Sequence, residues 1–535
     1  MCFSAPAMLA RRMPARSALP ESLQGLLRPA AYPHPVTAVT LIETQLSWVL
    51  LAGDRAYKIK RPVLYPFVDL SRLDDRRRLC HEELRLNRRF VPQLYLEVCP
   101  ITVAAGEARI GGDGKALEYA VVMRAFDRSE ELDRLVVEKR VAEAELAQFG
   151  RWLARAQREL PHWHGAGEVG QPVTVAAAVA RNAEECAQAS AVFGTGERVR
   201  TLGALLAAEA THREQALRWR AEQGRIRECH ADLHLSNVIR IDGQLLPFDC
   251  MEFEPAFRWI DVALDVAFLH ADLLGYGEPM LAAVFLDAWL AASGDYHANM
   301  VLPLYTADRA LVRAKVVALQ ASHVHRPGAA NAEALRQRQQ GYLLVAERAL
   351  HPPPPCCLMM TGLPGSGKSW LAARLATELG AVTVRSDLER KRLASPPGGG
   401  LYTDTQIVAV YQRLEQCAAE VLGGHRTVIV DANYGSRQQR AGLVELCRLV
   451  AVPLFVVQCE APLSLLRQRI SARLAAAQDP SEADIPVLER QLELCEPITA
   501  DERLAVITTR TDHADVVAVV LEELRRLHAP GSGQQ

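Results

Sequence analysis

The sequence lacks any marked excess of charge of one sign. Its 535 residues include 61 Lys and Arg against 63 Asp and Glu, which gives a formal net charge of −2, and residues 356–535 hold 19 basic and 21 acidic side chains. Proteins that bind nucleic acid or an anionic membrane surface usually rely on a basic excess. The composition therefore provides no general attraction to either partner, and nucleic acid is a disfavoured but open possibility.

Long apolar runs and paired cysteines are also missing. No apolar run approaches the roughly 20 residues that a membrane helix needs, so we expect no membrane partner. The 12 cysteines include no repeated C-x-x-C pair, and the adjacent Cys356 and Cys357 have poor geometry for an ordinary disulfide. A reducing, cytoplasmic location fits this pattern best.

The N-terminal stretch has basic residues but no apolar core. Residues 1–18 contain Arg11, Arg12 and Arg16 and no acidic residue. A transit peptide has this character, whereas a secretory signal requires an apolar segment. We interpret residues 1–19 as a disordered leader, with a transit peptide as the alternative.

The length of the chain predicts more than one domain. A chain of 535 residues, 49% of them apolar, is too long for a single core and predicts two or three domains. Four consecutive prolines at 352–355 cannot continue a helix and favour a stiff, extended spacer. We therefore predict domains at residues 20–350 and 356–530, joined by a proline linker at 351–355.

One glycine-rich octapeptide is the strongest motif of the sequence. It consists of Gly362, Leu363, Pro364, Gly365, Ser366, Gly367, Lys368 and Ser369. It follows an apolar run and precedes leucines at helical spacing, so we expect a strand, a loop and a helix. Glycines allow the loop to turn several N–H groups inward, and the start of a helix adds positive potential, so that a polyphosphate is held. Lys368 would reach the β- and γ-phosphates of ATP, and the Ser369 hydroxyl would ligate Mg²⁺.

Strands that alternate with helices after this motif predict a parallel sheet. Asp387 follows an apolar strand at its carboxyl end, where open α/β sheets bind ligands, and it could take a proton from a substrate hydroxyl. Asp431 ends a second apolar strand and suits a Mg²⁺ ligand. Arg469 and Arg473 share one helical stretch and could close over the transferring phosphoryl group, although a solvated helix face produces a similar pattern.

A second set of chemistry-bearing residues lies in the first domain. Asp232 precedes Asn237 by five residues, and an Asp-Gly hairpin should fold Asp249 back beside Asn237. This is the layout of protein-kinase-type phosphoryl transfer. Asp232 would orient or deprotonate the acceptor hydroxyl, while Asn237 and Asp249 would hold Mg²⁺ on the phosphates of ATP.

Such a site also needs a lysine from the small β-rich lobe that opens the domain. Lys58 has the spacing of the kinase Ala-x-Lys strand. Lys60 faces the same way because strand side chains alternate, so it is an alternative, and a solvated strand face is another. Glu83 would pair with the lysine from the following helix, with Glu82 as its alternate.

Residues 20–350, above all HADLHLSN at 230–237 and FDCMEF at 248–253, resemble the aminoglycoside phosphotransferase and choline-kinase-like family of small-molecule kinases. The resemblance implies a bilobal α+β domain of the protein-kinase type. It also implies that His230 is structural and that Asp261 and Asp265 brace the catalytic loop.

Residues 356–528, with the motifs GLPGSGKS, RSDLERKRL and VIVDANY, resemble the small P-loop kinases grouped with gluconate kinase, zeta toxin and the polynucleotide 5′-hydroxyl kinases. The resemblance implies an α/β P-loop domain that acts as an ATP-dependent phosphotransferase. The whole arrangement resembles bacterial proteins described as bifunctional aminoglycoside phosphotransferase/ATP-binding proteins.

Three functional hypotheses follow. The first is an enzyme with two ATP- and Mg²⁺-dependent phosphoryl-transfer centres that act on hydroxyl groups of small molecules. In the second, only the P-loop kinase is active and the first domain is a non-catalytic binding or regulatory module, because no glycine-rich loop precedes Lys58 and Met251 replaces the glycine of Asp-Phe-Gly. The third is a nucleic-acid 5′-hydroxyl kinase, against which the charge balance stands. The sequence names neither acceptor nor the oligomeric state.

Overall fold

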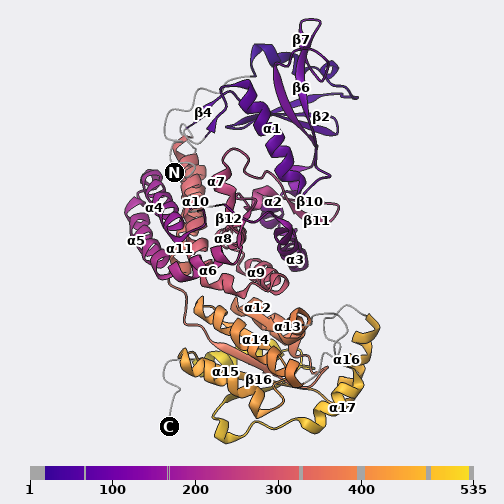
Figure 1. Cartoon of the computed structure of the whole chain (residues 1–535), viewed down its shortest axis with the longest axis vertical. Helices are drawn as coiled ribbons and strands as arrows, with labels where there is room; N and C mark the ends of the chain where they lie inside the picture. Colours follow the sequence, from indigo (N-terminus) through magenta and orange to yellow (C-terminus); the bar gives the residue numbers. More distant parts are fainter. Residues whose placement is uncertain are drawn as a thin grey trace. The chain divides into compact units, whose positions relative to one another are not determined.

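The structure is a computed structural model that describes residues 19–65, 68–165, 167, 169–323, 329–393, 404–476 and 484–528 (Figure 1). The leader expected at residues 1–19 therefore lies almost wholly outside the described residues. The chain divides into two compact units. The first comprises the described residues up to Phe149 together with Ala156–Glu278 and Leu304–Leu350, and the second comprises Gly150–Arg155, Pro279–Pro303 and the described residues from His351 onward.

This division differs from the one expected at the prolines. The segment Pro279–Pro303, which we placed in the first domain, groups with the elements that follow His351. A functional boundary at residues 351–355 therefore remains a prediction, and the second unit contains chain from both sides of it.

The first unit opens with a six-stranded antiparallel sheet in the order β1-β2-β3-β8-β6-β7. Along β3 the side chains alternate between its two faces. Tyr57 and Ile59 enter a core shared with Trp48 of β2, whereas Lys58 and Lys60 face helix α1. The six strands of this sheet are β1 (Val39–Glu43), β2 (Ser47–Ala52), β3 (Arg55–Lys60), β6 (Tyr95–Ala104), β7 (Glu107–Ile110) and β8 (Glu118–Arg124). The strands β4 (Leu64–Tyr65) and β5 (Val68–Asp69) form a separate antiparallel pair.

The rest of this unit is mainly helical. It also contains a short β-hairpin, β10–β11, and an antiparallel pair of strands that are distant in sequence, β9–β12. Residues 196–222 form two successive helices, because the backbone leaves helical geometry at Arg213 (φ −92°, ψ 6°). The elements are α1 (Leu73–Arg88), α2 (Leu132–Val137), α3 (Glu143–Glu159), α4 (Pro172–Ala189), α5 (Gly196–His212), α6 (Glu214–Glu222), β9 (Ile226–Glu228), β10 (Val238–Ile241), β11 (Gln244–Pro247), α7 (Pro255–Arg258), β12 (Trp259–Asp261), α8 (Val262–Gly275), α10 (Leu302–His323) and α11 (Ala329–Leu350).

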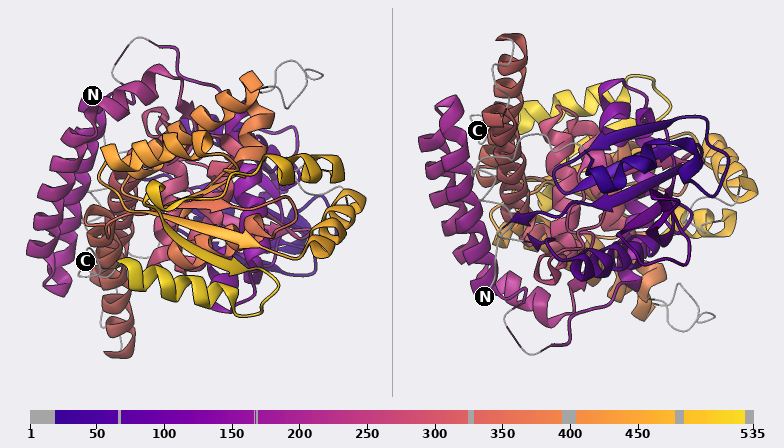
Figure 2. Two further views of the ribbon diagram at one scale, coloured as in Figure 1. Left: turned by 90° about the horizontal axis from the view of Figure 1, so that it is seen from below. Right: turned by 90° about the horizontal axis from the view of Figure 1, so that it is seen from above.

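The second unit is built on a five-stranded parallel sheet in the order β14-β15-β13-β16-β17. Every residue of β13 and β15 is buried, as expected for strands covered on both faces, and Figure 2 shows helices on either side of the sheet. Its elements are α9 (Pro279–Ser293), the short 3-10 helix η6 (Tyr296–Met300), β13 (Cys357–Thr361), α12 (Lys368–Leu379), β14 (Val382–Arg385), α13 (Ser386–Leu393), α14 (Asp404–Gly423), β15 (Val428–Asp431), α15 (Arg437–Leu449), β16 (Leu454–Glu460), α16 (Leu463–Ala476), α17 (Ile485–Leu494), β17 (Ala505–Arg510) and α18 (Val516–His528).

Helices α12 and α18 share one apolar core with the sheet, in which Leu358, Leu375 and Val520 are fully buried. Sequence periodicity predicted this parallel α/β arrangement, and the structure has it. Among the described residues, no helix combines the length and the apolar character needed to cross a bilayer.

We predict that Leu375→Ala destabilises the second unit by about 2–5 kcal/mol, because it removes a fully buried side chain and leaves a cavity beneath the sheet. Native-state hydrogen exchange at the amides of β13 and β15 measures this change. Leu379 on the same helix is 39% exposed, and its replacement by Ala should cost less than about 1 kcal/mol. Equal losses for the two variants would contradict the core assignment.

Candidate functional site

The glycine-rich octapeptide forms a tight loop between β13 and α12. Its backbone has φ of +144° at Gly362 and +85° at Gly367, and α12 begins directly after Gly367. A Cβ at Gly362 would lie 2.5 Å from the carbonyl oxygen of Cys459, and one at Gly367 would lie 2.7 Å from Oγ1 of Thr511. Because no larger side chain fits these positions, glycine is required for the loop to turn where it does. The first turn of α12 is left facing the loop, which is the arrangement that binds phosphate.

The loop is braced by a residue that sequence reasoning missed. The Thr511 hydroxyl, just after β17, donates a hydrogen bond to the carbonyl oxygen of Ser366. Arg469 donates to Thr511 Oγ1 over 2.9 Å and to the carbonyl oxygen of Gly365 over 3.2 Å. Arg469 therefore supports the loop in this structure, and the idea that it closes over a phosphoryl group stays a prediction. Arg473 lies one turn further along α16 and is partly buried.

A buried carboxylate lies beside the start of α12. Asp431 ends β15 in register with Met360 of β13 and Arg385 of β14, so three strands reach this point together. Burial raises the pKa of Asp431, and the charges of Lys368 and Arg385 oppose that rise. Its Oδ1 is buried and has no hydrogen-bond partner among the described residues, while the nearby Ser369 hydroxyl opposes the rise in the pKa of this carboxylate. A buried oxygen without a partner next to a hydroxyl fits a hard cation such as Mg²⁺.

Asp387 lies in the first turn of α13, immediately after β14. Its carboxylate pairs with Arg390, with Nη1 2.9 Å from Oδ1, and both side chains remain partly exposed. Asp387 is also close enough to Asp431 for its charge to raise the pKa of that residue. The structure thus brings Asp387, Asp431 and the octapeptide together at the carboxyl ends of the strands, where ligands of such sheets bind.

In the first unit, one buried glutamate joins two lysines. Glu83 of α1 pairs through Oε1 with Lys58 at 2.8 Å and through Oε2 with Lys60 at 2.7 Å. Lys58 also bonds to Asp249 Oδ1 at 2.6 Å, and Lys60 bonds to Glu252. Burial alone would raise the pKa of Glu83, but the two lysines outweigh it and lower that pKa below its usual range. Both lysines are therefore engaged, and Lys58 is the one that contacts Asp249.

The loop that carries Asp232 is held by acidic side chains of α8. Asp265 accepts hydrogen bonds from the backbone N–H groups of His230 and Ala231, each over 2.8 Å, and Asp272 accepts one from Leu235 N over 2.9 Å. His230 bonds through its ring to the carbonyl oxygen of Phe248. The resemblance placed Asp261 in this bracing role as well.

Asp261 has a different role in the structure. It pairs with the buried Arg220 at 2.6 Å and accepts a hydrogen bond from Ala263 N, which caps the start of α8. Neither of these two contacts involves the loop at residues 230–237. Its carboxylate therefore anchors α8, while Asp265 and Asp272 of that helix hold the loop.

Asp232, Asn237 and Asp249 lie together, as the hairpin predicted. Asn237 donates to Asp232 Oδ2 over 3.0 Å, and the N–H of Phe248 bonds back to the carbonyl oxygen of Asn237 over 2.9 Å. Burial would raise the pKa of Asp232, but His234 above all lowers it to about 2. Such a weak base is better suited to orienting a hydroxyl than to storing its proton. The amide and carboxylate oxygens of Asn237 and Asp249 are ligands that Mg²⁺ accepts.

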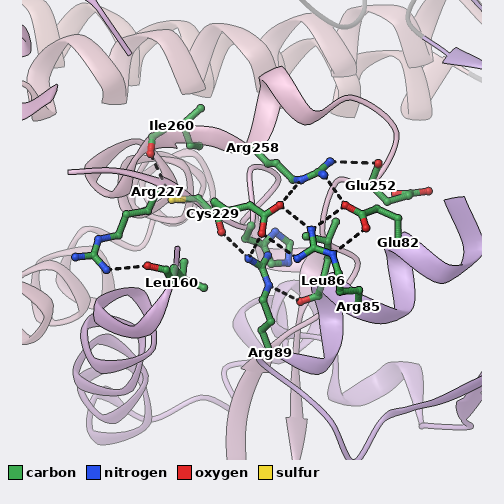
Figure 3. Close-up of polar contacts among 12 residues, drawn as sticks. Glu82, Arg85, Leu86, Arg89, Leu160, Arg227, Cys229, Glu252, Arg258 and Ile260 are labelled. Atoms are coloured by element: carbon green, nitrogen blue, oxygen red, sulfur yellow. Dashed lines mark hydrogen bonds and ion pairs between the residues drawn. The ribbon is translucent and has the colours of Figure 1, made fainter. Parts of the chain in front are cut away.

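Helix α1 is fixed by an ion network that the sequence did not reveal. Arg85, Arg89 and Arg258, which converge in Figure 3, each donate to the buried carboxylate of Glu228, over 2.7, 3.0 and 3.0 Å. Arg258 also bonds to Glu82. Glu82, the alternate partner for the lysine, is thus taken up by arginines, whereas Glu83 faces the lysines. Removing one member of such a buried network is costly because it leaves the other charges unpaired.

These observations define the second unit as an α/β protein with a P-loop nucleotide-binding domain. In agreement, residues 357–498 match a family model described as an AAA domain. The uncharacterized protein Rv2004c of Mycobacterium tuberculosis (strain ATCC 25618 / H37Rv) is 32% identical over 458 residues, which cover 83% of this chain and 89% of that protein. The uncharacterized protein Mb2027c of Mycobacterium bovis (strain ATCC BAA-935 / AF2122/97) matches with the same values. The chain belongs to the family of these mycobacterial proteins.

Solved structures similar to this chain cover about one third of it. They include a sugar kinase from Janibacter sp. HTCC2649 (TM-score 0.27, 18% identity, 34% of this chain and 100% of that chain). A gluconokinase from Sinorhizobium meliloti 1021 has a TM-score of 0.27 and 22% identity and covers 32% of this chain and 93% of its own. The APS kinase CysC of Mycobacterium tuberculosis, in complex with AMPPNP and APS, has a TM-score of 0.25 and 21% identity and covers 33% of this chain and 100% of its own.

We predict that Thr511→Val weakens binding of ADP about 5-fold, because the variant loses the hydrogen bond to Ser366 and a bond of this kind contributes about 1 kcal/mol. Isothermal titration of the full chain with ADP measures the dissociation constant. Thr508 on β17 is exposed, so Thr508→Val serves as the control and should bind ADP as the wild type does. Unchanged binding by Thr511→Val would show that the loop keeps its shape without this brace.

Proposed function

We propose that the second unit is an ATP-dependent kinase that transfers a phosphoryl group to a hydroxyl of a small molecule. The observation that carries the proposal is the position of Asp387 near Asp431, at the carboxyl ends of the strands, where the octapeptide also lies. A nucleotide-binding domain alone needs no second carboxylate here, whereas a kinase needs a group that accepts the proton of the attacking hydroxyl.

Each residue has a role in this proposal. The N–H groups of the octapeptide and Lys368 bind the phosphates of ATP. Ser369 and Asp431 would hold Mg²⁺, which neutralises phosphate charge. Asp387 orients the acceptor hydroxyl and receives its proton, with Arg390 keeping the carboxylate in place. Because little covalent chemistry is required of the protein in phosphoryl transfer, positioning and charge provide most of the catalysis.

We expect Lys368→Ala in the full chain to weaken ATP binding about 10- to 100-fold, since a charge-assisted hydrogen bond contributes about 1.5–3 kcal/mol. Titration with a fluorescent ATP analogue and the rate of ADP release provide the measurements. Arg374→Ala, an exposed change on the same helix, controls for the loss of a positive charge. Unaltered ATP binding by Lys368→Ala would refute the P-loop assignment.

As a second candidate function, we infer that the first unit is a further phosphotransferase centre. Two observations support it. Lys58 bonds to both Glu83 and Asp249, and Asn237 bonds to Asp232. In this proposal Lys58 binds phosphate, Asn237 and Asp249 would hold Mg²⁺, and Asp232 orients a hydroxyl acceptor. The alternatives are a non-catalytic binding or regulatory module and, for the whole protein, a nucleic-acid 5′-hydroxyl kinase. The balanced charge of the chain does not favour the last of these.

A variant pair separates these readings of the first unit. Wild-type protein is incubated with labelled ATP and an extract of metabolites, in parallel with Asp232→Asn and with Asp242→Asn, an exposed change at the tip of the neighbouring hairpin. We expect Asp232→Asn to lower labelling of at least one compound by about 10²- to 10⁴-fold, and Asp242→Asn to leave it unchanged. Identical labelling patterns in all three samples would favour the non-catalytic module.

A further inference from the structure

The second unit includes a segment that sequence analysis assigned to the first domain. Helix α9 packs against β14 and α12, and η6 packs against α14, as Figure 1 shows for α9 and α12. The sheet order places β14 at an edge of the parallel sheet. An exposed edge strand leaves backbone groups without partners. A segment that covers this edge can bond to those groups and so fix the position of β14.

One residue of β14 has its edge-facing backbone groups bonded by this segment. Asp287 of α9 accepts a hydrogen bond from Thr383 N over 2.7 Å, and its two carboxylate oxygens accept from Thr383 Oγ1 over 3.0 and 2.9 Å. The hydroxyl of Tyr296, in η6, donates to the carbonyl oxygen of Thr383 over 3.3 Å. The edge of β14 is thus bonded at Thr383 by side chains from residues 279–303.

Charged side chains tie the same segment to α13. The carboxylate of Glu389 is fully buried and bonds to both Arg392 and Arg413. Each arginine also donates to a backbone carbonyl oxygen of the segment, Arg392 to Ala291 and Arg413 to Gly294. The strand β14 and the helix that follows it are therefore held at two places by residues 279–303.

This support matters because α13, which directly follows β14, carries Asp387, the residue proposed to orient the acceptor hydroxyl. Arg385, two residues after Thr383, pairs with Asp431 at 3.6 Å, and Asp387 follows in the first turn of α13. Burial raises the pKa of Asp287 to about 6, and the bonds from Thr383 together with the charges of Arg385 and Arg426 oppose that rise. A carboxylate held under the strand in this way costs stability unless its bonds to Thr383 are kept.

We propose that Asp287 is a positioning residue for the P-loop centre: through Thr383 it fixes β14, and so holds Asp387 where it can meet the acceptor hydroxyl. The proposal rests on the proposed kinase function of this unit. It assigns a part of that function to α9, outside the P-loop motif and outside residues 357–498 that match the AAA domain. Positioning of this kind affects turnover strongly because small displacements of a reacting group are costly.

The test compares variants of the full chain by affinity for an ATP analogue and by ADP release with saturating Mg²⁺ and ATP, a reaction in which water takes the place of the acceptor hydroxyl and receives the phosphoryl group. We expect Asp287→Ala to lower turnover about 10- to 100-fold while its affinity for the analogue stays within about 2-fold of the wild type, because the octapeptide is untouched. Asp287→Asn, which can still accept from Thr383 N, should recover part of the loss. Met280→Ala, an exposed change on α9, should match the wild type.

A second comparison distinguishes positioning from general loss of structure. If Asp287 acts through Asp387, then Asp287→Ala should lower turnover no further once Asp387 has been changed to Ala. Thr383→Val, which keeps the strand but loses the hydroxyl, should lower turnover in the same direction and less than Asp287→Ala. This variant also keeps the test decisive should Asp287→Ala fail to fold.

The outcomes separate the two proposals. If Lys368→Ala abolishes turnover but Asp287→Ala and Thr383→Val retain it, only the positioning role is overturned. The same conclusion follows if Asp287→Ala reduces turnover equally with and without Asp387. If turnover does not depend on Lys368, the proposed kinase function fails, and the role of Asp287 in it fails too.

Discussion

The close approach of backbone segments around the P-loop is the constraint on which the second unit depends. The loop passes so near to β16 and to the residue after β17 that side chains at Gly362 and Gly367 would collide with Cys459 and Thr511. Because the loop turns there, α12 starts directly after Gly367, and Ser369 in its first turn lies near the carboxylate of Asp431. The fold of the sheet and the phosphate-binding geometry are thus one feature.

In both units, the charged groups of the proposed sites depend on support from residues further away. In the second unit, Asp387 lies on α13, directly after the edge strand β14, whose backbone is bonded at Thr383 by Asp287 of α9. In the first unit, Glu83 stands on a helix that three arginines tie to Glu228. In the proposed roles, these supporting residues do not themselves bind ATP or the acceptor. Such residues act by reducing the freedom of the groups that would carry it.

Local patterns predicted the parts of the fold that are set by neighbouring residues. The octapeptide, the alternation of strands and helices after it, and the hairpin that brings Asp249 to Asn237 are all present. The choice of Glu83 over Glu82 also holds, and the structure gives the reason, since Glu82 pairs with Arg85 and Arg258. Both lysines contact Glu83, a result that strand alternation allowed but did not select.

The sequence by itself determined the motifs whose meaning is local: the glycine loop, the strand ends that carry carboxylates, and the periodicity of the helices. Only the tertiary structure decided which distant residues support them. Thr511 reaches the loop across 145 positions of the chain, and Asp287 reaches Thr383 across 96. A single hydrogen-bonding side chain leaves no periodic signal in a sequence, because its partner is chosen by packing rather than by spacing. The grouping of α9 with the P-loop elements has the same origin.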